Sequence, residues 1–283
     1  MGFTPVAPSA ARATLLANNP REYTPVRHML VQRHEKDPST GERASTLATL
    51  LRERKHRSLT LYLLLLTAWS GLEHADEPLG SYAWVRALTS DHKGALTWSE
   101  STLSRTWSDL ESRGLITRTR ESRLVRIAPR REDGEADYTK PAGGKEPEEH
   151  YFTLPHAFWK DEWFARLKMP ALAVFLIIAK ETNAKSEIHP TLKQFEDWYG
   201  ISRKSAQAGV NQLQEEGLLH RRFEQVLAPL SKTGYTTRVY YSLTGDFGYE
   251  SRKAAQARAT KAVRARAKSA EPPAAEATKT PSS

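Results

Sequence analysis

A pattern of residues recurs along this 283-residue chain after a shift of 103 positions. The two copies share residue character: a serine, three apolar residues at helical spacing, a glycine, two apolar residues and an arginine. The copies are Ser99, Leu103, Trp107, Leu110, Gly114, Leu115, Ile116, Arg118 and Ser202, Ala206, Val210, Leu213, Gly217, Leu218, Leu219, Arg221. Each copy must form a similar small unit, so the repeat constrains the fold more than composition does. We expect two domains, at 41–131 and 150–248, which also suits the length.

The second copy has the clearer local signals. Apolar residues spaced i, i+3, i+7 predict a short helix that Gly200 ends. Ser202 can cap the next helix by accepting a hydrogen bond from an N–H of its first turn. Thr-, Val- and Tyr-rich segments around Lys232-Thr233-Gly234 predict a hairpin. The expected order is a buried helix, a short helix, a longer helix and a hairpin, at 170–180, 191–199, 203–216 and 218–243.

The first copy follows the same order. A leucine-rich run predicts its core helix, a short helix comes next, and Gly114 ends the third helix, which starts after Thr97 or Ser99. The expected ranges are 59–69 and 81–88 for the first two helices, with hairpin strands at 116–120 and 124–128. The first copy departs in one place, because the turn at 89–96 is several residues longer than a standard helix-turn-helix turn. The predicted fold is mainly α with small β-hairpins (α+β), arranged as two winged helix-turn-helix domains in tandem.

The second copy resembles the winged-helix module of plasmid replication initiator proteins. The resemblance is carried by the segments Tyr151-Phe152-Thr153-Leu154-Pro155, Ala171 to Lys180, Gly200-Ile201-Ser202-Arg203-Lys204-Ser205 and Leu213-Gln214-Glu215-Glu216-Gly217-Leu218-Leu219. It covers the second copy well and the first poorly. Winged-helix repressors share the last of these segments. The resemblance implies origin binding by two winged helices, and a transcriptional regulator is the alternative.

Helix residues that face away from the predicted core are candidates for reading bases. Arg suits guanine, and Gln or Asn suits adenine, by paired hydrogen bonds in the major groove. The second copy offers Arg203, Lys204, Gln207 and Asn211, and the first offers Ser101, Ser104, Ser108 and the nearby Arg105. The residues of the first copy are mostly smaller and less basic. We therefore expect the second copy to read bases more strongly, although any one of these residues could instead belong to a solvated helix face.

The predicted hairpins carry much of the basic excess. Residues 115–131 have a net charge of +5 and residues 218–245 one of +3, within a chain total of +9. Arginine suits bidentate phosphate contact and the minor groove. The backbone-contact candidates are Arg118, Arg120, Arg123, Arg126, Arg221, Arg222, Lys232 and Arg238. The alternative for these residues is ordinary solubility of exposed strands.

Three further segments lack a core pattern. We expect residues 1–40 to be extended or poorly ordered, and residues 132–149, with a net charge of −5, to be an acidic linker or a long docked loop. Residues 249–283 are expected to form a basic, disordered or partly helical tail. Its candidates for non-specific phosphate contact are Arg252, Lys253, Arg258, Lys261, Arg264, Arg266 and Lys268. A merely solubilising tail is the alternative.

The sequence favours a binding protein over an enzyme. It has no cysteine, no His-Glu-x-x-His spacing and no glycine-rich phosphate loop after a strand, so we expect no metal, no cofactor and no catalytic residues. No apolar run approaches the ~20 residues of a membrane span. We expect a cytoplasmic protein, associated with the nucleoid or a plasmid, whose partners are double-stranded DNA and the replication or transcription machinery. A homodimer and a protein-interaction or scaffold role stay open.

Overall fold

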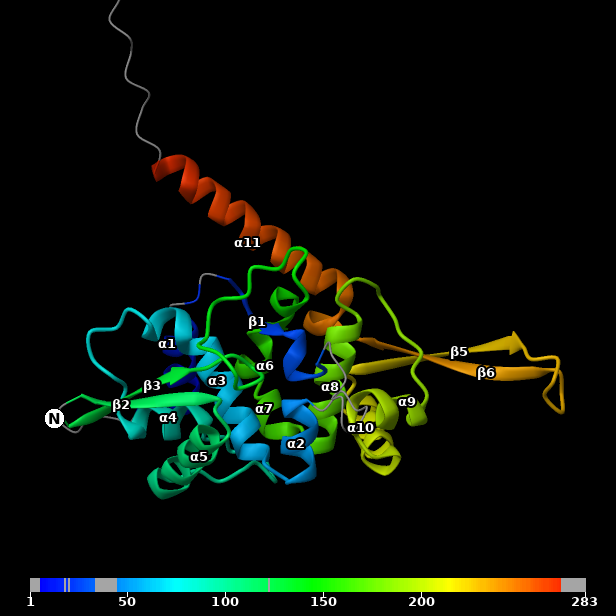
Figure 1. Cartoon of the computed structure of the whole chain (residues 1–283), viewed down its shortest axis with the longest axis horizontal. Helices are drawn as coiled ribbons and strands as arrows, with labels where there is room; N and C mark the ends of the chain where they lie inside the picture. The colour runs from blue at the N-terminus through cyan, green and yellow to red at the C-terminus, as the bar shows by residue number, and fades with distance from the viewer. Residues whose placement is uncertain (1–5, 18, 20, 34–44, 122, 271–283) are drawn as a thin grey trace, which may run out of the picture.

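The computed structural model describes residues 6–17, 19, 21–33, 45–121 and 123–270, with side chains as far as residue 265. Over these residues the chain forms an α+β fold of helices and three two-stranded antiparallel sheets (Figure 1). None of the helices described here combines the length and the apolar character that a membrane crossing requires.

Two sets of elements correspond to the two sequence copies. The first unit consists of α3 (His56–Leu72), α4 (Ser81–Leu88), α5 (Glu100–Ser112), β2 (Ile116–Glu121) and β3 (Leu124–Pro129). The second unit consists of α8 (Met169–Glu181), α9 (Leu192–Tyr199), α10 (Arg203–Glu215), β5 (Leu219–Leu227) and β6 (Tyr235–Leu243). These elements agree with the predicted order of three helices and a hairpin in both copies. The strands of the second hairpin are nine residues long and those of the first are six.

The other elements join the two units. They are α1 (Pro8–Ala17), β1 (Tyr23–Arg27), η1 (His28–Leu30), α2 (Thr46–Arg52), η2 (Pro147–Glu149), β4 (Tyr151–Pro155), α6 (Ala157–Lys160), α7 (Trp163–Arg166), η3 (Gly245–Phe247) and α11 (Tyr249–Ala270). Strand β1 pairs antiparallel with β4, from Tyr23 opposite Pro155 to Arg27 opposite Tyr151. The N-terminal segment is thus hydrogen-bonded to the chain just before the second unit.

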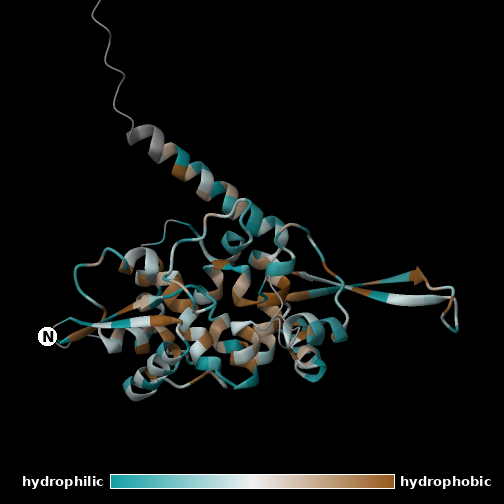
Figure 2. Cartoon of the chain, viewed as in Figure 1, coloured by the Kyte–Doolittle hydropathy of each residue, from teal (hydrophilic) through white to brown (hydrophobic). Residues whose placement is uncertain are grey.

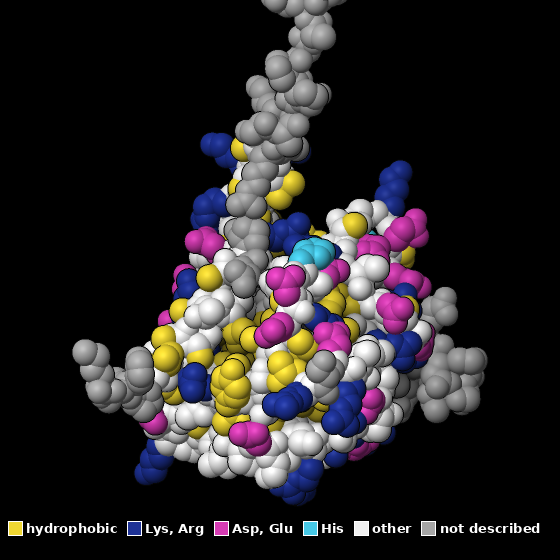
Figure 3. Space-filling view, turned by 90° about the vertical axis from the view of Figure 1, so that its left-hand side faces the viewer, with side chains coloured by type: hydrophobic (Ala, Val, Ile, Leu, Met, Phe, Trp, Pro, Cys, Tyr) yellow, Lys and Arg dark blue, Asp and Glu magenta, His cyan; other side chains and the backbone are white. Residues whose placement is uncertain are grey.

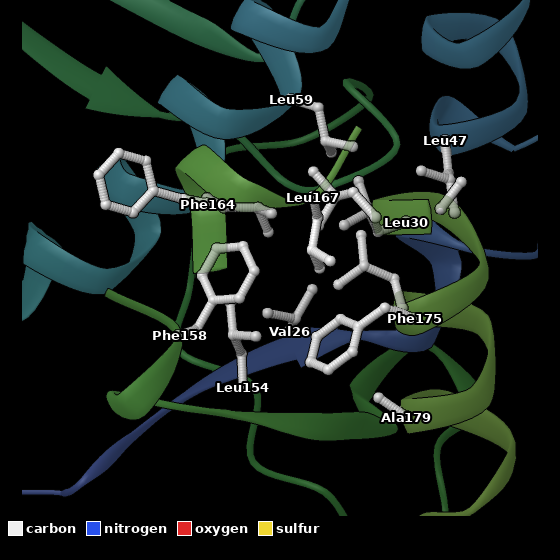
Figure 4. Close-up of a cluster of buried hydrophobic side chains, with 14 of the residues drawn as sticks. Val26, Leu30, Leu47, Leu59, Leu154, Phe158, Phe164, Leu167, Phe175 and Ala179 are labelled. Atoms are coloured by element: carbon white, nitrogen blue, oxygen red, sulfur yellow. The ribbon is translucent and has the colours of Figure 1, made fainter. Parts of the chain in front are cut away.

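A single hydrophobic core runs through both units. Figure 4 shows side chains from β1, α2, α3, β4, α6, α7 and α8 pointing toward one another. Leu59 of the first unit and Phe175 of the second belong to this same cluster, and both are buried. The hydropathy colouring agrees, with apolar residues concentrated in the centre of the body (Figure 2). The two units therefore pack as parts of one body around a common interior.

The N-terminal prediction was wrong for the residues that form α1. Instead of an extended or poorly ordered segment, residues 8–17 form α1, and only 23–27 are extended, as strand β1. Arg12 of α1 is buried and donates hydrogen bonds to the carbonyl oxygens of Ala87 and Thr89 and to the Glu162 carboxylate. Pro8 stands at the first position of α1, where proline costs no hydrogen bond. Residues 1–5, 18, 20 and 34–40 lie outside the described residues.

The acidic segment is a loop docked on the body. Glu132 is fully buried, and its carboxylate accepts hydrogen bonds from the Arg27 backbone N–H at 3.0 Å and from the Arg27 guanidinium at 3.2 Å. The same guanidinium also reaches Glu149 and the carbonyl oxygen of Thr139. The sequence left open a linker or a docked loop, and the structure shows a docked loop. The acidic charge balances a buried arginine 105 residues away.

The long helix α11 leaves the body on the upper side in Figure 1, away from α5 and α10. Its first turns are anchored, because the guanidinium of Arg252 is buried and donates to the carbonyl oxygens of Phe247, Ala179 and Thr182 at 2.8–2.9 Å. The prediction that Arg252 contacts phosphate was therefore wrong: its hydrogen bonds already hold α11 to the second unit. The helix confirms a partly helical tail, and residues 271–283 lie outside the described residues.

Candidate nucleic-acid interface

Helix α10 is positioned by caps and by close packing. Ser202 accepts a hydrogen bond from the Ser205 N–H at 3.2 Å, as the sequence predicts, and Gly200 takes the left-handed conformation with φ 64°. Gly209 faces α8 so closely that a β-carbon there would lie 2.5 Å from the carbonyl oxygen of Pro170. Because the packed side of α10 is fixed against α8, its opposite side is presented to solvent with a defined orientation.

The four base-reading candidates of the second unit lie together on the outer side of α10. Lys204 and Asn211 are exposed, and the Gln207 side-chain amide donates to the Asn211 side-chain oxygen at 2.7 Å. Arg203 is also exposed, but its Nε donates to Glu196 at 2.8 Å. An adenine could replace the Gln207–Asn211 contact with hydrogen bonds of the same kind, whereas Arg203 would first have to leave its carboxylate partner.

The candidates of the first unit are exposed on α5 but bind their own helix. Ser99 caps α5 by accepting from the Thr102 N–H at 3.2 Å. The Ser108 hydroxyl donates to the Ser104 carbonyl oxygen at 3.2 Å, and the Arg105 Nε donates to the Ser101 carbonyl oxygen at 3.3 Å. The serines are shorter side chains than Lys204, and Arg105 is bonded back to its own helix. The weaker base reading expected of the first unit stays a prediction.

Helices α5 and α10 lie on the same lower side of the molecule in Figure 1, with α2 between them. A groove of about 710 Å³ separates α2 from the turn between α9 and α10. Arg52 and Arg54 line it from the α2 side, and the other side is lined by Ser202 and Ser205 together with the acidic residues Glu196 and Asp197 at the end of α9. Neither arginine has a carboxylate within ion-pair distance among the described residues. Two exposed cations thus stand beside the N-terminus of α10.

Sequence reasoning missed Arg52 and Arg54. The signal was present, since the run Arg52-Glu53-Arg54-Lys55-His56-Arg57 comes directly before the apolar core helix of the first unit. Its other cations are engaged within the fold: the Lys55 ammonium lies 2.7 Å from Asp109, and Arg57 donates to the carbonyl oxygen of Thr97 at 3.3 Å. The pKa of Asp109 is held at about 2, because the bonds from Arg113, Lys55 and Ser58 outweigh its desolvation.

Part of the arginine charge of the first hairpin is already paired with carboxylates of the protein. Arg118 is paired with Glu111 of α5. Arg126 is paired with Glu121 and also donates to the carbonyl oxygens of Ala75 and Asp76 at 3.0 and 3.2 Å. We therefore correct the assignment of Arg126, which fastens the hairpin to the loop after α3. Arg120 and Arg123 are exposed, as a backbone-contact role requires.

In the second hairpin, too, some basic side chains are engaged within the fold and others are exposed. Arg222 is paired with Glu187 and Glu224, which raise its pKa, and it stacks on the Tyr240 ring at 4.0 Å. Arg221 is half-buried, with its guanidinium 5.2 Å from the centre of the Phe223 ring. Lys232 in the turn and Arg238 on β6 are exposed. Lys232 and Arg238 are thus the exposed predicted cations of this hairpin that form no ion pair among the described residues.

The remaining tail candidates lie along α11. Arg258 is paired with Glu22 at 2.8 Å, and the Lys253 ammonium lies 5.4 Å from the centre of the Tyr249 ring. Lys261 and Arg264 are exposed. The side chains of Arg266 and Lys268 lie outside the described residues. The exposed cations of α11 are on the upper side of the molecule, so they do not extend the face that carries α5 and α10 (Figure 1).

The left-hand end of the molecule mixes charges of both signs. Figure 3, which looks onto the left-hand end of Figure 1, shows Lys and Arg interspersed with Asp and Glu rather than gathered in one basic field. No group of three His, Asp or Glu suited to hold a metal ion occurs among the described residues. Comparison with protein-family models, curated proteins and solved structures gave no match.

Proposed function

We propose that this protein binds double-stranded DNA sequence-specifically through two winged-helix units, with α10 as the main recognition helix. The observation that carries the proposal is the solvent-facing side of α10, where Lys204, Gln207 and Asn211 stand on a helix with capped and packed geometry. An α-helix fits the major groove, and side chains of these types distinguish base pairs there.

The strand pairing supports the winged-helix assignment. In such units a short strand before the second helix pairs with the last strand of the hairpin. In the second unit Ile188 forms this bridge with Tyr241, with N···O distances of 3.0 and 2.6 Å. In the first unit the corresponding loop is held to the hairpin through the Arg126 side chain, at the carbonyl oxygens of Ala75 and Asp76. Both hairpins are thereby tied to the helices beside them.

The shared core adds a property that flexible tandem domains lack. Since α5 and α10 belong to one packed body, the two segments of DNA that they contact must keep a fixed distance and helical phase. Arg52 and Arg54 between them suit the phosphates of the intervening backbone, where contacts position the protein without reading sequence. The proposal therefore includes a bipartite target site of fixed spacing.

Selection of duplexes from a random library by the full-length protein tests this function. We expect an enriched site with a strongly specified part and a weakly specified part. Inserting five base pairs between the two parts should remove the contribution of the weaker part, because half a helical turn moves it to the opposite side of the duplex. Lys204→Ala should weaken the selected site, whereas Gln214→Ala, an exposed change near the end of α10, should not. Enrichment of no sequence at ~150 mM salt would contradict the proposal.

For the biological role we propose replication initiation at origin repeats, on the strength of the resemblance of the second unit to plasmid initiators. The test is whether DNA that carries this gene and its flanks replicates autonomously in a host without the protein. Lys204→Ala with Asn211→Ala should abolish that replication. A selected site that lies at a promoter, with altered transcription and no replication phenotype, would assign the protein to transcriptional regulation instead.

A further inference from the structure

The second hairpin exposes more apolar side chain than a soluble body requires. Phe223, Leu227 and Tyr235 are 57%, 74% and 53% exposed, and Leu230 in the turn is fully exposed. Single exposed apolar residues are ordinary, but a cluster on one projecting element marks an interaction surface. The hairpin points away from the body along the long axis of Figure 1, and the end of β5 is apolar in Figure 2.

The apolar residues share one face of the ribbon. Phe223 is opposite Val239 and Leu227 is opposite Tyr235 in the strand register, and alternate residues of a strand point to the same side. The other face carries charged groups, among them Arg222, Glu224 and Arg238. The ribbon is therefore amphipathic beyond the point where its base, from Leu219 and Leu243, enters the core.

The turn that carries Leu230 is held by its own hydrogen bonds. The Ala228 N–H donates to the Gly234 carbonyl oxygen and the Ser231 N–H to that of Ala228, both at 2.8 Å, while the Ser231 hydroxyl donates to the Tyr235 carbonyl oxygen at 3.0 Å. Pro229 fixes the backbone just before Leu230. Polar residues or glycine are usual in such turns. The fold thus presents a proline and a fully exposed leucine at a preorganised tip.

We propose that the β5–β6 hairpin bends duplex DNA by inserting Leu230 between adjacent base pairs in the minor groove, with Lys232 on a neighbouring phosphate. This inference rests on the proposed DNA binding. Leucine and proline are among the residues that proteins use as wedges in the minor groove, where insertion kinks the duplex by roughly 20–90° toward the major groove. DNA suits this tip better than an apolar protein partner, because Lys232 lies two positions from the leucine and, like Arg238 on β6, is exposed and forms no ion pair among the described residues.

The reach of the hairpin fits this placement. Eight residue steps from Leu219 to Leu227 extend about 26 Å along the strand. The minor groove next to a major groove that α10 occupies lies about half a helical turn away, or ~17 Å. The tip can therefore meet the duplex while α10 stays in its groove. The bend should be easiest at flexible TA or CA/TG steps, so the selected site should favour one of them at the position of the tip.

Two fluorescence measurements on the full-length protein test the wedge: energy transfer between dyes at the ends of a selected duplex, and the emission of 2-aminopurine at the step facing the tip. The wild type should shorten the end-to-end distance and raise the 2-aminopurine emission as the bases unstack. Leu230→Ala should remove most of both signals, with affinity reduced by no more than about tenfold and base preference kept. Val263→Ala, which truncates an exposed apolar residue on α11, should behave like the wild type.

The measurements can contradict the Leu230 wedge without contradicting the proposed DNA binding. Specific binding by the wild type without bending or unstacking would overturn the wedge and leave the proposed function standing. Equal signals from wild type and Leu230→Ala would do the same. A wild-type dimer in light scattering without DNA that Leu227→Ala and Leu230→Ala both convert to monomer would assign the apolar face to a second copy and overturn the wedge. Absence of binding to any selected duplex would overturn the proposed function and the wedge with it.

Discussion

The two hairpins follow helices of the same plan, yet their exposed ends differ. The first is short, and Arg123 stands in its turn; the second is longer and carries Pro229, Leu230 and Lys232 at its tip. The helices before them differ in parallel, because α5 exposes serines that bond to their own backbone, whereas α10 exposes a lysine and two amides. In the proposed function, the first unit would therefore contact mainly the DNA backbone, and the second would read bases and deform the duplex.

This division of roles depends on the two units acting as one body. The Arg27 guanidinium, wholly buried, bonds Glu132 after the first hairpin and Glu149 before the second unit. Strand β1, which carries Arg27, pairs with β4 at the start of the second unit. The difference between the units can be used only if their relative placement is fixed, and the buried ion pairs of Arg27 are part of what fixes it.

The largest expected effect comes from breaking that connection. Arg27→Ala should lower the free energy of unfolding by about 3–5 kcal/mol, because it leaves the Glu132 carboxylate buried without its cation. The measurement is urea denaturation followed by tryptophan fluorescence and by circular dichroism. Arg33→Ala is the matched control: it removes an arginine–glutamate pair, with Glu135, that is exposed on both sides, and should change stability by less than ~1 kcal/mol.

A single transition in the wild type and a single, weaker one in Arg27→Ala would support one body. Two separate transitions in the wild type would show that the units fold independently, and the comparison between them would then describe two domains joined only by a loop.

Acid should destabilise the first unit and the segment before α6 together. Desolvation, with a smaller effect of Arg57 and Lys160 respectively, lowers the pKa of His56 and of His156 from 6.5 to about 4. Between these values the unfolded chain binds protons that the folded chain does not, so stability falls as the pH drops from about 6.5 to about 4. The slope is at most ~1.4 kcal/mol per pH unit for each histidine and vanishes below pH ~4.

Denaturation at several pH values checks this expectation, with His56→Gln for the first unit and His156→Gln for the segment before α6. Each variant should flatten the slope of one common transition. If each altered only a separate transition, the two regions would respond to acid independently, which the shared core does not allow.

Local elements could be predicted from the sequence because their signals are local. The cap at Ser202 and the helix-ending glycine at Gly200 are where periodicity and turn chemistry place them, and α5 starts after Ser99, one of its two predicted starts. The docking of the acidic segment could not be predicted, since the partner of Glu132 is 105 positions away and leaves no pattern nearby. The burial of Arg252 could not be predicted either, because its acceptors are backbone carbonyl oxygens. A sequence does not reveal which carbonyl oxygens lack other partners.

The charge of the candidate interface was predicted in sum but not in detail. The hairpins are basic by composition, yet Arg118, Arg126 and Arg222 are held by carboxylates of nearby or distant segments. A net charge counts such arginines as available for phosphate, whereas the fold has already used them. Conversely, the sequence did not predict Arg52 and Arg54 as interface residues, since their run also contains Glu53. Only the packing of α2 beside α10 places them at the candidate interface.

The difference proposed between α5 and α10 can be measured one side chain at a time. Asn211→Ala should reduce discrimination between the selected site and a duplex with one changed base pair by about 1–3 kcal/mol. Ser108→Ala, at the matching position of α5, should cost less than ~0.5 kcal/mol. Competition binding by fluorescence anisotropy measures both. Equal losses would show that the two helices read bases alike, against the division drawn above.

The smallest expected effect separates a phosphate contact from a structural arginine within the first hairpin. Arg123→Ala should weaken binding to all sequences alike and reduce the slope of log K against log salt by about one, because one fewer phosphate is neutralised. Arg126→Ala is the internal comparison: its side chain holds the loop at Ala75 and Asp76, so the melting temperature should fall while the salt slope stays. Titrations from 50 to 200 mM salt, with melting curves of the same proteins, distinguish the two. A lower slope for Arg126→Ala with an unchanged melting temperature would place that arginine on the DNA, and the first hairpin would then be the basic arm that its composition suggests.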